Sequence, residues 1–155
     1  MFNEKDLEKF LRERNVEFEL LKFDEPVVSS ELARKQVNGI IIKSILLICD
    51  DKHLLCLLLG KDKIDFEKIK RELNYKNVRL AKAKEVKEIT GYDIGAVPPI
   101  AHKQKIKTIV DSKVDGVNDE EVVYLGGGSH YHLLKIKKKE LLKILQGVET
   151  KRISE

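Results

Sequence analysis

Residues 40–49 read IIIKSILLIC and residues 53–59 read HLLCLLL, and these two apolar runs decide the fold. The turn residues Asp50, Asp51 and Lys52 separate the runs, which predicts a β-hairpin. Continuous apolarity indicates strands that are covered on both faces. Because helical patterns precede and follow the hairpin, the sequence predicts an α+β, or mixed α/β, class with a central sheet.

The composition is that of one globular domain, residues 1–155, with a heavily charged surface. Hydrophobic residues make up 42% of the chain and charged residues 36%, and the net charge is +4. This length can bury a core without disulfides or metals, and the mild positive charge is compatible with an anionic partner. No apolar run approaches the roughly 20 residues of a membrane span and no signal-peptide pattern begins the chain, so we expect a cytoplasmic protein.

The two cysteines, Cys49 and Cys56, both lie in the apolar runs. Their spacing suits neither a zinc site nor a disulfide framework, so we expect two buried, small hydrophobic side chains. Nothing in the sequence calls for a cofactor.

Helices and short strands alternate around the hairpin. Capping residues followed by apolar stripes predict helices over residues 4–14, 30–37, 66–73, 84–90 and 138–145. Alternating or β-branched runs predict strands over residues 16–20, 78–81, 103–111, 121–125 and 130–136. Asp115 and Gly116 form a turn, and we expect the last residues of the chain to be frayed.

Lys43 is the anomaly of the first apolar run. A period of two places it on the same face as Ile45, Leu47 and Cys49, so its ammonium leaves an apolar strand. Lysines near a strand start commonly extend to water along their own alkyl chains. The alternative is a cation presented in a cleft to an anionic or carbonyl oxygen.

Residues 91–102 read GYDIGAVPPIAH and are almost free of charge. Glycine permits positive φ, and Pro98 and Pro99 remove two amide donors, so this segment is neither a helix interior nor a central strand. It is either a rigid binding loop or an ordinary connection. The next segment alternates Lys103, Lys105 and Lys107 with other residues, which indicates either a phosphate-binding face or a lysine-protected edge strand.

A third loop, residues 126–129, reads GGGS and follows a predicted strand directly. Its amides could hold an oxyanion, although the spacing matches neither a P-loop nor a dinucleotide fingerprint. His130 and His132 follow on one face of the next predicted strand, but no third ligand accompanies them, so we expect no metal site.

Four segments in this order resemble the YbaK/prolyl-tRNA synthetase-associated domain family. They are residues 42–46 (IKSIL), 90–102 (TGYDIGAVPPIAH), 107–111 (KTIVD) and 123–129 (VYLGGGS). The resemblance covers nearly the whole chain. It implies a mixed, largely antiparallel, barrel-like sheet with flanking helices. It also implies a free-standing editing hydrolase that removes alanine, cysteine or serine from mischarged tRNA, most often tRNA(Pro).

The resemblance assigns the essential catalytic role to Lys43. It implies that Gly95, Ala96, Val97 and Pro98 form a wall of the aminoacyl pocket. The remaining implied substrate-binding residues are Phe23, Ser44, Gly126, Gly127, Gly128, Ser129, His130 and His132. Phe23, Ser44 and the region of His132 depart from common family residues, which leaves the amino acid open. The family often uses a hydroxyl or thiol of the substrate itself, so no protein nucleophile is required.

Three functions follow from these observations. The first is an aminoacyl-tRNA deacylase that binds the acceptor end, with Lys103, Lys105 and Lys107 as hypothesised contacts to tRNA phosphates. The second is a non-catalytic module of the same fold that binds tRNA or an aminoacyl-tRNA synthetase. The third, a small-nucleotide binder, is disfavoured because only 6% of residues are aromatic and bases need aromatic side chains to stack on. None of the three involves a membrane or DNA.

Overall fold

The centre of the computed structural model, which describes all 155 residues, is the hairpin of β2 (Ile40–Cys49) and β3 (Lys52–Leu59). The two strands pair antiparallel, with Lys43 opposite Leu58. Ile42 and Leu46 of β2 belong to one hydrophobic cluster and Leu47 to another. The predicted hairpin, with both faces covered, is therefore confirmed.

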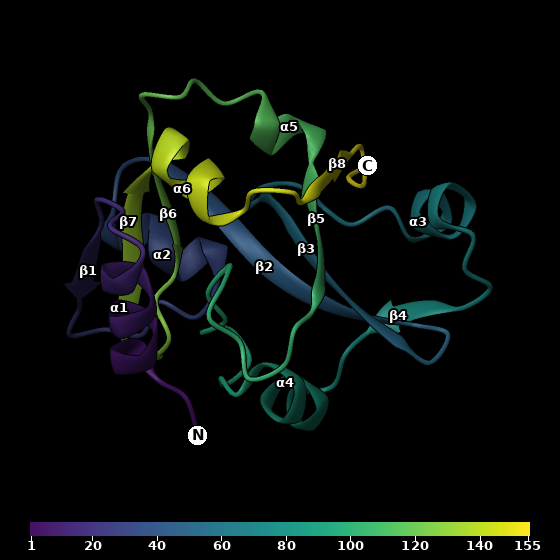
Figure 1. Cartoon of the computed structure of the whole chain (residues 1–155), viewed down its shortest axis with the longest axis horizontal. Helices are drawn as coiled ribbons and strands as arrows, with labels where there is room; N and C mark the ends of the chain where they lie inside the picture. The colour runs from purple at the N-terminus through teal and green to yellow at the C-terminus, as the bar shows by residue number, and fades with distance from the viewer.

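Eight strands form one mixed sheet around this hairpin (Figure 1). Its order is β1 (Glu19–Lys22), β7 (His132–Lys137), β6 (Val122–Gly126), β2, β3, β5 (Lys107–Asp111) and β8 (Glu149–Lys151), while β4 (Val78–Leu80) pairs with the end of β2. Four pairings are antiparallel and three are parallel. The α/β class is thus the predicted one, but the sheet is open and does not close into a barrel, because β1 and β8 end it without pairing with each other.

Six helices flank the sheet: α1 (Glu4–Glu13), α2 (Ser30–Gln36), α3 (Phe66–Leu73), α4 (Ala83–Thr90), α5 (Ser112–Asp115) and α6 (Lys138–Ile144). The side chains of Asn3, Ser29 and Asp65 cap α1, α2 and α3. Asn3 and Asp65 are the caps that the sequence predicts, and of the two serines that could cap α2, Ser29 and Ser30, the structure shows Ser29. The short helix α5 was not predicted, because four residues carry no apolar period. None of these helices has the length and apolarity that crossing a bilayer requires.

The outer edge of β2 is interrupted, and this interruption creates the site. β6 pairs with β2 at Ile40 and Ile41, whereas β4 pairs with it from Leu47 onward. The carbonyl oxygen of Leu46 accepts a hydrogen bond from the amide of Ala81. Because successive residues of a strand direct their backbone groups to opposite edges, Ser44 shares the outward orientation of Leu46. The backbone of Ser44 therefore faces the gap between β6 and β4.

Three strand predictions need correction. β5 begins at Lys107 because its pairing with β3 begins there, so Lys103 and Lys105 precede the strand and the three lysines do not share one strand face. β7 begins at His132, and His130 lies in the preceding turn, so the two histidines do not line one strand. The first strand covers residues 19–22 rather than 16–20, because it pairs with β7 from Glu19.

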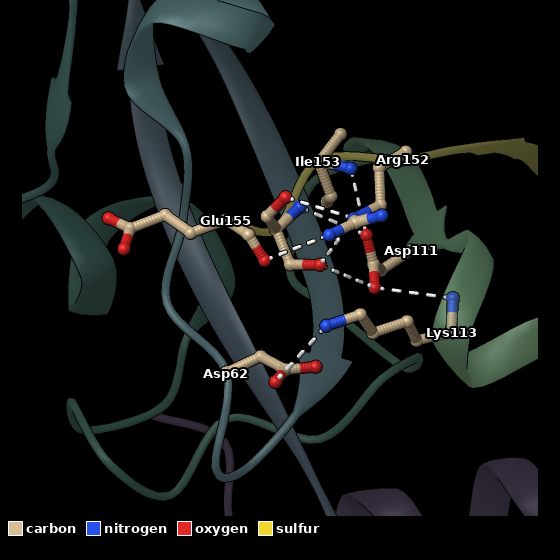
Figure 2. Close-up of polar contacts among 7 residues, drawn as sticks. Asp62, Asp111, Lys113, Arg152, Ile153 and Glu155 are labelled. Atoms are coloured by element: carbon tan, nitrogen blue, oxygen red, sulfur yellow. Dashed lines mark hydrogen bonds and ion pairs between the residues drawn. The ribbon is translucent and has the colours of Figure 1, made fainter.

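The end of the chain is ordered rather than frayed (Figure 2). β8 extends the sheet beside β5. Beyond it, the fully buried carboxylate of Asp111 accepts hydrogen bonds from the amides of Ile153 and Ser154, at 2.8 and 3.0 Å, and from the Ser154 hydroxyl at 3.0 Å. Arg152 donates to the carbonyl oxygens of Ser154 and Glu155. The sequence prediction failed here because the partner carboxylate lies more than 40 residues earlier in the chain.

Candidate functional site

A cavity of about 520 Å³ opens at the interrupted edge of β2. Lys43 and Ser44 line it from β2, Gly95 and Val97 from the loop after α4, and Gly126 from the end of β6. The structure thus brings together five of the residues that the sequence singled out. Most of the remaining wall is apolar, as is usual for a pocket that binds a small organic group. Its apolar members are Val27, Val28, Ala33, Ile41, Ile42, Ile45, Leu46, Leu80, Ala81, Val86, Ile94, Leu125 and Leu133.

The side chain of Lys43 is partly buried, and its ammonium forms no hydrogen bond or ion pair within the chain. Burial lowers the pKa of its ammonium below the ordinary value of 10.5. The nearby carboxylate of Asp62 acts in the opposite direction, and Lys63 lowers the pKa further. An unpaired cation in an apolar cleft retains its capacity to bind an oxygen of a ligand, since no protein group occupies it.

Asp62 follows β3, and its carboxylate acts on Lys43 and on Lys113. Its Oδ1 is 3.6 Å from the Nζ of Lys113, and the side chain is only 12% exposed. Figure 2 draws this ion pair as a dashed line. Its Oδ2 is buried and has no hydrogen-bond partner. Lys113 follows Asp111 closely in the chain, and the Asp111 carboxylate accepts a hydrogen bond from the Lys113 amide. The amide of Glu155 donates to the carbonyl oxygen of Lys63 at 2.9 Å, so the ordered C-terminal segment holds the backbone next to Asp62.

Ser44 carries a second unused polar group. Its hydroxyl is buried, has no hydrogen-bond partner and belongs to a residue that lines the cavity. Buried hydroxyls are normally satisfied, so an orphaned one beside a cavity is a group that a ligand can satisfy.

The two glycine-containing loops contact each other through their backbones. A Cβ atom at Gly126 would lie 2.3 Å from the carbonyl oxygen of Val97. The amide of Gly128 donates to the carbonyl oxygen of Ala96 at 3.0 Å. Gly95 adopts φ of +85°, and a Cβ there would lie 2.6 Å from the carbonyl oxygen of Val28. Only glycine permits these approaches, which close the cavity wall.

Internal bonds hold the loop over residues 91–102 in shape. The buried Tyr92 donates its hydroxyl to the carbonyl oxygen of Ala101 at 2.9 Å. His102 Nε2 lies 2.7 Å from the carbonyl oxygen of Pro98. Burial lowers the pKa of His102, with the Pro98 bond opposing this shift. The loop is therefore built as a rigid wall rather than as a loose connection.

Several predicted site residues do not line the cavity. Ala96 and Pro98 are buried within their loop, and Gly127, Gly128 and Ser129 lie beyond the lining residue Gly126. Phe23 packs against a cluster formed by Val27, Ala33, Ile41 and Leu133, all of which line the cavity. Phe23 therefore packs behind the cavity wall and does not line the cavity itself.

The two histidines are engaged elsewhere. His130 is exposed, and its Nε2 lies 3.6 Å from a carboxylate oxygen of Asp93. His132 shares a hydrogen bond with the Ser129 hydroxyl. The structure brings together no group of three or more His, Cys, Asp or Glu side chains that could hold a metal ion.

Both cysteines are buried and free, as the sequence predicts. Burial raises the pKa of the Cys49 thiol to about 11 and also raises that of Cys56. Neither lines the cavity. Thiols of this kind stay protonated near neutral pH and are poor nucleophiles.

The sequence analysis missed the contribution of α2 and the segment before it. Ser29, Ser30, Glu31 and Arg34 supply polar side chains to the cavity, and Val28 meets the loop at Gly95. A short capped helix carries no local pattern that reveals which loop it will face. The glycine at position 95 was the available indication in the sequence, because glycine often marks a close approach of another backbone.

The fold and the cavity define an α/β domain in which the free ammonium of Lys43 lies in a cavity that two glycine-containing loops help to line. The aminoacyl-tRNA editing domain model matches residues 24–144. The chain therefore belongs to the aminoacyl-tRNA editing domain family, which bears out the resemblance of its motifs.

Known relatives are similar in sequence or in structure. The proline–tRNA ligase of Lactobacillus gasseri is 40% identical over 77 residues, which is 50% of this chain and 14% of the ligase. That of Halalkalibacterium halodurans is 31% identical over 108 residues, 61% of this chain and 19% of the ligase. The chain thus matches less than a fifth of the length of these relatives. A crystal structure of a candidate trans-editing enzyme for prolyl-tRNA synthetase superposes with a TM-score of 0.84 at 26% identity, covering 98% of this chain and 96% of the other.

Proposed function

We propose that this domain hydrolyses the ester bond of mischarged aminoacyl-tRNA in trans, with alanine, cysteine or serine on tRNA(Pro) as the candidate substrates. The observation that carries the proposal is Lys43, a cation without a partner in a cavity walled by Gly95, Val97 and Gly126. The family match and the structural neighbour support the same activity.

The chemistry follows from the groups that line the cavity. Lys43 would hold either the carbonyl oxygen of the ester or a phosphate of the terminal nucleotide, and so orient the ester for attack. A water molecule or a hydroxyl or thiol of the substrate would attack the carbonyl carbon. The bond to the ribose oxygen then breaks, and that oxygen takes up a proton. The lining residues include no histidine or cysteine, which suits a reaction that does not use a protein nucleophile.

The cavity also suits selection by size. Rigid loops exclude a larger side chain by steric overlap, whereas a missing methylene costs only about 1 to 3 kcal/mol in binding. We expect the Ser44 hydroxyl, which lacks a partner, to bind a polar atom of the aminoacyl group.

The tRNA would reach the cavity along a positively charged surface. Lys103, Lys105 and Lys107 are all exposed, and we retain them as proposed contacts to acceptor-stem phosphates. Cytoplasmic translation is the setting that this function implies, with an aminoacyl-tRNA synthetase as a further candidate partner.

Release of the amino acid from mischarged tRNA tests the function. The purified chain is incubated with Ala-, Cys- and Ser-tRNA(Pro), and both free amino acid and bound tRNA are measured. Hydrolysis of at least one of them supports the proposal. Binding without hydrolysis overturns it in favour of a non-catalytic tRNA-binding module.

A further inference from the structure

A second cavity, of about 320 Å³, adjoins the first. Its walls are formed by eight residues, Arg34, Gly39, Ile40, Ile41, Leu59, Gly60, Lys61 and Val117. Arg34, Ile41 and Gly60 line both cavities. A ligand that extends out of the first cavity past these three residues enters the second.

The charge of the second cavity has one sign. Arg34 and Lys61 are its only charged residues, and no carboxylate lines it. Both side chains are exposed, and neither forms a hydrogen bond or an ion pair within the chain. Some other cations of the chain have a carboxylate partner, as Arg79 has Glu85 at 2.8 Å. Two free cations over one cavity attract an anion.

The remaining residues of the wall are uncharged: Gly39, Ile40, Ile41, Leu59, Gly60 and Val117. The positions that a Cβ would take at the two glycines are already filled, by the ring of Tyr124 at Gly39 and by the side chain of Ser30 at Gly60. The two cations are therefore the groups of this cavity that can attract an anion.

We propose that the second cavity binds the phosphodiester that precedes the terminal adenosine of the tRNA, through Arg34 and Lys61. This inference rests on the proposed function, because it assumes that the aminoacyl-adenosine lies in the first cavity with the carbonyl oxygen of its ester, and not this phosphate, at Lys43. The nucleotide chain must then leave that cavity, and the shared wall at Arg34 leads it to two unpaired cations. A guanidinium contacts two phosphate oxygens at once, and an ammonium adds a point charge.

The test compares two substrates that carry the same amino acid. One is an aminoacylated minihelix that ends in CCA, and the other is the aminoacyl ester of adenosine, which has no phosphate. The Arg34→Gln/Lys61→Gln variant should raise KM for the minihelix about tenfold to a hundredfold, with little change in kcat. Lys61→Gln alone should leave hydrolysis of the adenosine ester unchanged, since Lys61 lines only the second cavity and this substrate has no phosphate for it to bind.

A control pair removes the same charge away from both cavities. Arg71 and Lys76 are exposed and line neither cavity, so Arg71→Gln/Lys76→Gln should keep the wild-type KM. Salt dependence supplies an independent measure, because removing the cation from one single-strand phosphate should reduce the slope of log affinity against log salt concentration by about 0.7. Binding of the uncharged minihelix, followed by fluorescence anisotropy, should show this reduction for the Arg34/Lys61 variant only.

The outcomes separate the two proposals. If the wild type hydrolyses the minihelix and the Arg34/Lys61 variant keeps its KM and salt slope, the phosphate site is wrong while the function stands. Equal losses of Lys61→Gln on the minihelix and the adenosine ester also overturn the site, because Lys61 lines only the second cavity and such losses indicate damage to the first. If the wild type hydrolyses neither substrate, the proposed function fails, and the anisotropy measurement alone then decides the phosphate site.

Discussion

The α-carbon of Gly126 lies so close to Val97 that an added Cβ would be 2.3 Å from the Val97 carbonyl oxygen. This approach joins the end of β6 to the loop after α4, and both residues line the main cavity. The two glycine-containing loops therefore pack against each other and form adjoining parts of one cavity wall. Their close approach depends on the absence of a side chain at Gly126.

Gly126→Ala should separate these loops. The methyl group would meet backbone, which cannot rotate away, so we expect a loss of about 2 kcal/mol in the free energy of unfolding and a fall in deacylation. Gly116→Ala is the control, because its nearest atoms are 3.6 Å from an added Cβ. Chemical denaturation and initial rates measure both effects. Equal stability and activity of the two variants would show that the close approach is dispensable.

Asp111→Asn should release the end of the chain. The carboxylate accepts three hydrogen bonds from Ile153 and Ser154, and an amide cannot accept all of them, so we expect a loss of roughly 3 kcal/mol in the free energy of unfolding. Ser154→Ala removes only one of these bonds and should cost about 1 kcal/mol. Hydrogen exchange at the Ile153 and Ser154 amides provides a local measurement. Unchanged protection of these amides in Asp111→Asn would contradict the account.

Asp62→Asn should lower the pKa of Lys43 further. Burial lowers this pKa and the Asp62 carboxylate raises it, so neutralising the carboxylate removes the main stabilisation of the ammonium. NMR titration of the Lys43 side chain measures the change directly. Asp51→Asn, in the turn at the far end of β2, is the charge-matched control and should leave the titration unchanged. A rise in the Lys43 pKa on losing Asp62 would reverse our assignment of its neighbours.

The lowered pKa of Lys43 also makes the free energy of unfolding depend on pH, and the direction of the shift fixes the sign of this dependence. Because the pKa of Lys43 is lower in the folded chain than the ordinary value of 10.5, the unfolded chain binds more protons between the two values. This contribution therefore raises stability as the pH rises through that window. Lys43→Met should abolish it and increase stability at neutral pH, as expected when a functional cation is kept in an apolar site. Denaturation of both proteins across this pH range measures the difference, and identical pH profiles would contradict the assignment.

Lys103, Lys105 and Lys107 test where the acceptor stem lies. Changing all three to glutamine should reduce the salt dependence of activity on full-length tRNA, by about 0.9 in slope for each duplex phosphate that is no longer neutralised. Activity on a CCA trinucleotide substrate should not change, because it has no stem. An unaltered slope on full-length tRNA would exclude these lysines as phosphate ligands.

The parts of the fold that are written locally could be predicted from the sequence. The β2–β3 hairpin follows from two apolar runs and a turn, and Asn3, Ser29 and Asp65 mark helix starts because capping spans only two or three residues. The arrangement of all the strands in one mixed sheet was predicted only through the resemblance to a family. The C-terminal segment could not be predicted, since Asp111 holds it from 42 and 43 residues away.

Residues of the candidate site could be predicted from the sequence only where their local context is unusual. Lys43 breaks an apolar strand, and Gly95 and Gly126 lie in conspicuous loops, so sequence alone singled them out. Arg34 and Lys61 have no such context, because exposed cations are common in a chain with 36% charged residues. Only the cavity that they share in space distinguishes them.

The decisive experiment is the hydrolysis of Ala-, Cys- and Ser-tRNA(Pro) beside Pro-tRNA(Pro), by the wild type, Lys43→Ala and Lys76→Ala. Lys76 is an exposed lysine that does not line the cavity, so its removal controls for charge. We expect selective deacylation of a mischarged tRNA by the wild type and by Lys76→Ala, and none by Lys43→Ala. Undiminished hydrolysis by Lys43→Ala, or hydrolysis of Pro-tRNA(Pro) as fast as of the mischarged forms, would contradict this expectation.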